Sequence, residues 1–113
     1  MVCQFTSAEG AFNAACDIQE AAVAAEGGEG PKLTIKVAFN WGPVVTEGGD
    51  VFGDTVNVCA RLGGLAGAHQ ILTTQQTIAE LPQLLRGRSR ELYPVKVRGR
   101  AEEVPVCEVL WRA

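Results

Sequence analysis

Residues 49–62 read GDVFGDTVNVCARL and carry the polar groups that are most informative about this chain. Asn57 and Arg61 are four residues apart, so on an α-helix they lie on one face, one turn from each other. The spacing also sets Asp50 at a helical interval from this pair. A guanidinium and an amide beside the free amides of a helix start favour a phosphate ligand. The stretch therefore predicts an anion-binding edge formed by Asp50, Asn57 and Arg61.

This stretch resembles the signature of the class III nucleotidyl cyclases, the adenylate and guanylate cyclases. Three further blocks are similar to segments of that family in order and spacing: VAFNWGPVV at 37–45, QILTT at 70–74 and VKVRGRAEEVPVCEV at 95–109. The resemblance implies an α+β fold of the ferredoxin-like type, a sandwich of a mainly antiparallel sheet with helices. We expect one partial cyclase catalytic domain over residues 1–113, truncated at its N-terminal side.

The resemblance also implies roles for single residues. Asn57 and Arg61 match the catalytic pair, in which the amide orients the ribose and the guanidinium stabilises charge on the α-phosphate. Four further positions match substrate-binding residues: Asp50, Val51, Phe52 and Arg98. Arg98 stands where the family commonly has Lys. A carboxylate at position 50 suits the exocyclic amine of adenine, which predicts ATP as the substrate.

The implied reaction converts ATP to cyclic AMP and pyrophosphate, by attack of the 3′-hydroxyl on the α-phosphate, in intracellular signal transduction. Mg or Mn ions serve this reaction in the family. Their aspartate ligands precede the region that this chain matches, so we expect no metal ligand here and no activity of the chain alone. Family sites form between two domains, which implies a homodimer or a second cyclase domain as partner. The competing interpretation is a non-catalytic nucleotide-sensing or interaction module derived from a cyclase domain.

Two simpler interpretations stand beside these assignments. Asn57 and Arg61 are also typical of an exposed helix face, and the basic cluster of Lys96, Arg98 and Arg100 is typical of a solvated hairpin edge. The run GGDVF at 48–52 is similar to the GGDEF turn of diguanylate cyclases. We disfavour that family because Val replaces the metal-binding Glu and because the run is expected to enter a helix instead of a hairpin.

The composition is typical of a soluble globular domain, with 113 residues of which 47% are hydrophobic and 20% charged. A net charge of -3 gives no basic field, so we expect no nucleic-acid partner. No apolar run reaches the roughly 18 residues of a membrane span, and we expect a cytoplasmic location. The four cysteines are widely spaced and predict reduced, buried thiols.

Periodicity predicts two main helices. Apolar residues at three- and four-residue intervals, Ile18 among them, predict the first over residues 8–25, with Ser7 as its cap. The second covers residues 54–65, capped by Asp54 or Thr55. A short helix is expected over 74–81 and an irregular or extended stretch over 84–93. Strands are expected at 1–5, 33–41, 44–45, 68–73, 95–98 and 104–110.

Overall fold

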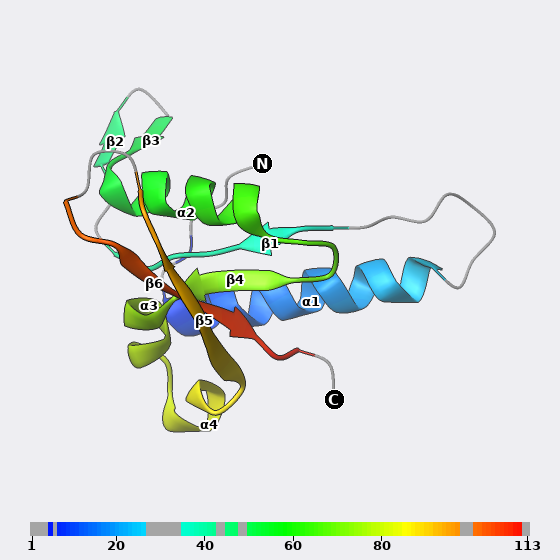
Figure 1. The fold of residues 1–113 in the computed structure, drawn as a ribbon. Coiled ribbons are helices and arrows are strands. Elements are labelled where there is room, and N and C mark those ends of the chain that lie inside the picture. Colours follow the sequence, from blue (N-terminus) through cyan, green and yellow to red (C-terminus); the bar gives the residue numbers. More distant parts are fainter. Residues whose placement is uncertain are drawn as a thin grey trace.

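The computed structural model describes residues 5, 7–26, 35–42, 45–47, 50–97 and 101–111. Its elements follow one another along the chain as labelled in Figure 1: α1 (Ala8–Glu26), β1 (Val37–Ala38), β2 (Val45–Glu47), β3 (Asp50–Phe52), α2 (Asp54–Leu65), β4 (Ile71–Thr74), α3 (Gln75–Ala79), α4 (Gln83–Arg86), β5 (Ser89–Val95) and β6 (Val104–Val109). Apart from Phe5, the strand expected at 1–5 lies outside the described residues.

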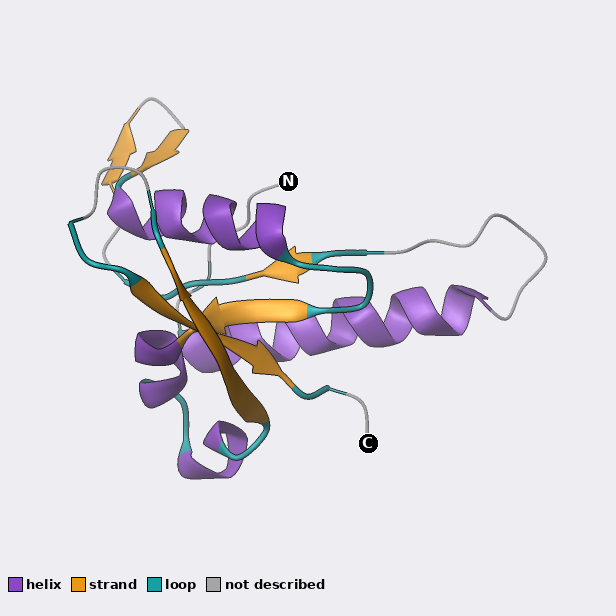
Figure 2. Ribbon diagram, in the orientation of Figure 1, coloured by secondary structure: helices purple, strands orange, loops and turns teal. Residues whose placement is uncertain are grey.

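One mixed sheet forms the centre of the molecule, with strand order β1-β4-β6-β5 (Figure 2). β1 runs parallel to β4, and β6 is antiparallel to both β4 and β5. A separate antiparallel pair, β2 and β3, precedes α2. The expected α+β fold with a mainly antiparallel sheet is thereby confirmed.

α1 packs on the sheet through small side chains, which allow close approach. Its first turn is capped as predicted, because the Gly10 amide donates to Ser7 Oγ at 3.0 Å. The prediction that Ile18 is buried is wrong, since 46% of this residue is exposed. The next residue, Gln19, is buried instead, and its side-chain amide nitrogen donates hydrogen bonds to two main-chain carbonyls.

Those partners join α1 to the segments that lead into β1 and β4, two neighbouring parallel strands of the sheet. Gln19 is fully buried, and its Nε2 donates to the carbonyls of Ile35 and Gln70, at 2.9 Å each. These carbonyls lie just before β1 and β4. The two donor bonds offset part of the cost of burying the amide, whereas its Oε1 has no hydrogen-bond partner among the described residues.

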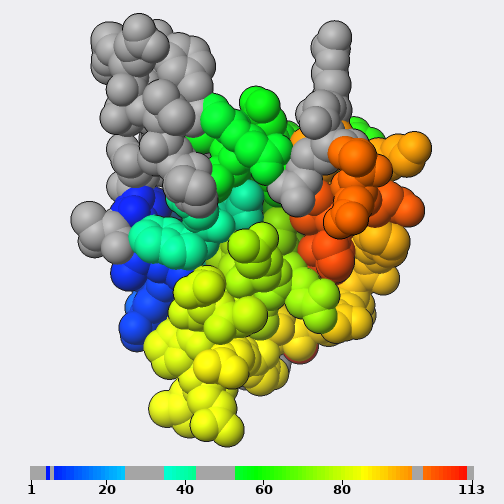
Figure 3. All heavy atoms as spheres, turned by 90° about the vertical axis from the view of Figure 1, so that its left-hand side faces the viewer, coloured from blue at the N-terminus to red at the C-terminus, as the bar shows by residue number. Residues whose placement is uncertain are grey.

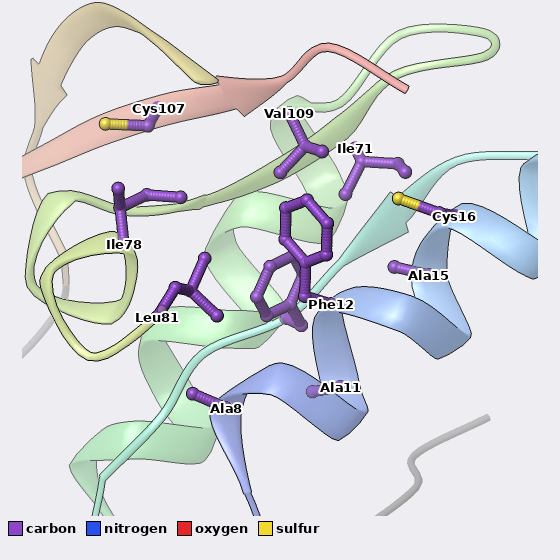
Figure 4. Packing of buried hydrophobic residues seen from close by; sticks show 11 residues of the cluster. Ala8, Ala11, Phe12, Ala15, Cys16, Ile71, Ile78, Leu81, Cys107 and Val109 are labelled. Atoms are coloured by element: carbon purple, nitrogen blue, oxygen red, sulfur yellow. The ribbon is translucent and has the colours of Figure 1, made fainter. Parts of the chain in front are cut away.

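The core has two clusters, because neighbouring residues of β4 point to opposite faces of the sheet. Ile71 packs with α1 and α3, whereas Leu72 packs with α2. In the first cluster Phe12 projects from α1 toward Ile71, Leu81 and Val109 (Figure 4). Its ring meets Phe39 edge-to-face, with centroids 6.2 Å apart. Phe39 is therefore a core residue.

Several predicted boundaries differ from the structure. Of the stretch expected to be irregular or extended at 84–93, residues 89–93 are extended as part of β5, whereas its first residues belong to the helix α4. The strand expected at 95–98 begins where β5 ends, at Val95. β5 lies at the edge of the sheet and is largely exposed, so it lacks the apolar alternation that marks a half-buried strand.

Candidate functional site

α2 begins and ends at the predicted residues, Asp54 and Leu65. Its N-cap, however, is Gly53, with φ at 118° and no side-chain hydrogen bond, so the predicted cap by Asp54 or Thr55 is wrong. This φ is accessible to glycine and strained for other residues. Gly53 lets the chain turn sharply from β3 into the helix.

The residues before Gly53 do not continue the helix. Asp50, Val51 and Phe52 form β3, which pairs with β2 in the register Glu47 opposite Asp50. The expectation that Asp50 shares a helical interval with Asn57 is therefore wrong, as is the expectation that the GGDVF run avoids a hairpin. The short β2 explains the error, because its pairing is not visible in the local pattern of residues 49–62.

Asn57 and Arg61 are brought together as their spacing predicts. Both are exposed on α2, and together with Ala60 and Val97 they line a cavity of about 290 Å³. The first turns of α2 (green) and the residues from 101 onward (orange) lie at the same end of the molecule in Figure 3. Arg98, the other predicted phosphate contact, lies outside the described residues, as does Arg100.

Val97 and Lys96 come to the site from the segment after β5. The basic cluster predicted Lys96 near the phosphates, but neither the contact of its main-chain carbonyl with Arg61 nor the contribution of Val97 was predicted. Arg61 Nε donates to the main-chain carbonyl of Lys96 at 3.4 Å. A guanidinium has five N–H donors, so this bond orients the group and leaves its other donors for an oxygen ligand. The side chain of Val97 is buried against the second core cluster and gives the cavity an apolar wall.

The opposite side of α2 is fixed to the sheet. Val58 and Leu62 are buried in the second core cluster. Cys59 Sγ contacts the Ala38 carbonyl at 3.5 Å, within the range of a thiol hydrogen bond. α2 thus buries one face and presents Asn57 and Arg61 on the other.

The cavity does not fit a divalent cation. Its lining offers one amide, one guanidinium and two hydrocarbon side chains, whereas Mg and Mn prefer carboxylate oxygens. The charge of Arg61 opposes a cation at this position. Among the described residues, no three His, Cys, Asp or Glu side chains come together as a metal site would require.

Three of the four cysteines are free thiols, as predicted; Cys16 and Cys107 are buried and Cys59 is half-buried, while Cys3 lies outside the described residues. Burial raises the pKa of Cys16, Cys59 and Cys107, with the nearby Arg88 opposing the change at Cys16. A raised pKa keeps a thiol protonated and unreactive near neutral pH. These cysteines are therefore packing residues.

No protein-family model matches the sequence, and no curated protein matches it either. Within the described part of the chain, no helix combines the length and the apolar character needed to cross a bilayer. The fold does have clear relatives among solved structures, and all three described below are cyclases.

An adenylate/guanylate cyclase/hydrolase from Silicibacter pomeroyi superposes with a TM-score of 0.80 at 27% identity, covering 94% of this chain. This chain spans 64% of the length of that structure. Two structures of Trypanosoma brucei adenylate cyclases in their monomeric state superpose with TM-scores of 0.51 and 0.50, at 23% and 19% identity. The two superpositions cover 61% and 88% of this chain. They cover 32% and 52% of the trypanosome chains. The resemblance seen in the sequence is therefore confirmed: this chain has the fold of a class III cyclase domain.

Proposed function

We propose that this chain supplies the ribose- and α-phosphate-binding half of an adenylate cyclase site. The assembled enzyme converts ATP to cyclic AMP and pyrophosphate in intracellular signal transduction, in the cytoplasm. The observation that carries this proposal is the exposed pair of Asn57 and Arg61 on one cavity, with Arg61 held by the Lys96 carbonyl.

The chemistry of this pair suits cyclisation of a nucleotide. Negative charge develops on the phosphoryl oxygens in the transition state, and an oriented guanidinium stabilises it without reorganising. The Asn57 amide offers both donors and an acceptor, which suits the ribose hydroxyl and ring oxygens. Ala60 and Val97 add apolar surface that limits the water around the reacting phosphate.

The proposal extends to the residues whose side chains the structure does not describe. Asp50 accepts a hydrogen bond from the exocyclic amine of adenine, with Val51 and Phe52 beside the base. Arg98 contacts the phosphates that leave as pyrophosphate. The family resemblance and the position of β3 directly before α2 support these roles.

The cavity residues do not fit Mg or Mn, so we assign the ions and their ligands to a partner domain, either a second copy or another cyclase domain. When bound, the ions would supply charge neutralisation at the phosphates and a more acidic 3′-hydroxyl. The chain alone is then expected to bind nucleotide weakly and to make no product.

A second candidate is a nucleotide-sensing module without catalysis. The lining of the cavity favours it, because an amide, a guanidinium and two hydrocarbon groups can hold a nucleotide but include no general base. This function needs the same two polar residues for binding and no partner domain for chemistry.

Complementation separates the two functions. The chain is mixed with a cyclase domain that keeps its metal aspartates but carries Ala at its own Asn and Arg positions, and cyclic AMP is measured with ATP and manganese. Turnover in the mixture alone supports the enzyme. ATP binding by the chain without turnover in the mixture supports the sensor. Turnover by the chain alone contradicts the division of the site, and neither binding nor turnover contradicts both functions.

A further inference from the structure

Asn40, two residues beyond β1, connects the starts of two helices. Its Nδ2 donates to the main-chain carbonyl of Thr55 in the first turn of α2, at 3.1 Å. Its Oδ1 lies 2.9 Å from the hydroxyls of both Thr74 and Thr77, where α3 begins. One of these hydroxyls donates to Asn40 and the other donates to its neighbour, because the two also share a hydrogen bond of 2.7 Å. These contacts orient the amide, because the reverse orientation would set its oxygen against the Thr55 carbonyl.

The loop that carries Asn40 is itself tightly held. The Trp41 amide donates to Thr77 Oγ1 at 3.0 Å, and Thr77 is fully buried. Gly42 lies so close to α2 that a Cβ at this position would be 2.7 Å from Thr55 Oγ1. The loop therefore packs against the first turn of α2 through Gly42 and is hydrogen-bonded to α3 through Trp41.

These contacts are made by the side of α2 that faces away from the site. Thr55 and Cys59 are one turn apart, and both contact β1 or the loop after it. Asn57 lies two residues after Thr55, and Arg61 lies two residues after Cys59. Two residues correspond to a rotation of about 200° around the helix. The anchored side thus sets the rotation and depth at which Asn57 and Arg61 reach the cavity.

We propose that Asn40 is a positioning residue for Asn57 and Arg61, a role that rests on the function proposed above. Asn40→Asp tests it, because the carboxylate keeps an acceptor facing the α3 threonines but sets an oxygen against the Thr55 carbonyl. Gln19→Met is the matched control, because it removes buried hydrogen bonds to the segments before β1 and β4 and leaves the bonds of Asn40, Thr74 and Thr77 in place.

Both variants are measured in the complementation assay, with thermal unfolding recorded for each chain. Small displacements of preorganised groups cost up to about a hundredfold in rate, so Asn40→Asp is expected to lower kcat about ten- to a hundredfold. KM for ATP should change much less, because Arg61 acts on charge that develops in the transition state. Gln19→Met, at a comparable loss of thermal stability, should keep kcat near the wild-type value.

Equal losses of kcat in the two variants, in proportion to their losses of stability, would overturn the positioning role. No turnover with the wild-type chain would overturn the proposed enzyme and this role together, which separates the two failures. If Asn40→Asp does not fold, Gly42→Ala displaces the same turn of α2 from the same loop. A wild-type kcat in a folded Gly42→Ala variant would then overturn the role.

Discussion

Arg61 Nε and the main-chain carbonyl of Lys96 are joined by a hydrogen bond of 3.4 Å across 35 residues of sequence. The bond connects the helix that carries the candidate site to the segment that follows the edge strand β5. It uses a main-chain acceptor, so it does not depend on which side chain stands at position 96. The bond is long and exposed, so it favours one orientation of the guanidinium without fixing it.

Replacing Arg61 by Ala should lower turnover in the complementation assay about a hundred- to a thousandfold, the scale for removing one preorganised donor. Arg90→Ala is the matched control, because it also removes one guanidinium. Arg90, on β5, pairs with Glu108 on β6 and does not line the cavity. Equal rates for the two variants would mean that the α-phosphate is held by another residue.

Replacing Asp50 by Ala should reduce the preference for ATP over GTP. The carboxylate accepts from the amine of adenine but meets the carbonyl of guanine with like polarity. A lost buried contact of this kind costs about 1 to 3 kcal/mol, so selectivity should fall roughly ten- to a hundredfold. Competition between ATP and GTP measures this ratio. Asp17→Ala, at an exposed position of α1, is the control for the change in net charge; an undiminished preference in Asp50→Ala would assign base selection to another group.

Replacing Gln19 by Met should lower the free energy of unfolding by about 0.5 to 1.5 kcal/mol, the net contribution of a hydrogen bond, because two carbonyls lose one donor but each keeps a main-chain donor, while the volume is nearly kept. Urea unfolding measures the loss. Gln75→Met is the control, since the Gln75 amide is exposed and bonds only to Glu91 at the surface among the hydrogen bonds described. Its effect should stay within about 0.5 kcal/mol. A similar, small effect at both positions would contradict the structural role of Gln19.

Stability should fall at alkaline pH through the buried thiols. Burial raises the pKa of Cys16, Cys59 and Cys107 above the ordinary value of 9.0. Below 9.0 the thiols are protonated in both states, so their contribution to stability is complete. Above it the unfolded thiols ionise first, which favours unfolding until the pH passes the folded-state pKa.

Thermal unfolding under reducing conditions, from neutral pH to well above 9.0, measures this decline. Cys59→Ala should make the decline shallower, because one of the three titrating thiols is removed. A slope unchanged by the substitution would show that other groups control alkaline stability. The half-buried Cys59 is preferred to Cys16 and Cys107, whose replacement would also open the core.

Local patterns predicted the parts of the site that depend on one element. Asn57 and Arg61 share a face because four residues make one helical turn, and the bounds of α2 followed from the same apolar periodicity. The prediction that Asp50 lies at a helical interval from this pair was wrong, because local periodicity does not reveal the short strand β3. A strand of three residues carries little periodicity of its own, and its partner β2 is equally short.

The sequence by itself determined the fold class, the helix that carries the candidate pair and the family resemblance, because each is encoded in spacing along the chain. Only the tertiary structure decided that Gln19 replaces Ile18 in the core, that Lys96 orients Arg61 and that Asn40 anchors α2. Each of these depends on a main-chain carbonyl or a hydroxyl that the packing of segments distant in sequence brings within reach of a polar side chain. A polar side chain is stable where such a group lies within its reach, and no local pattern specifies that position.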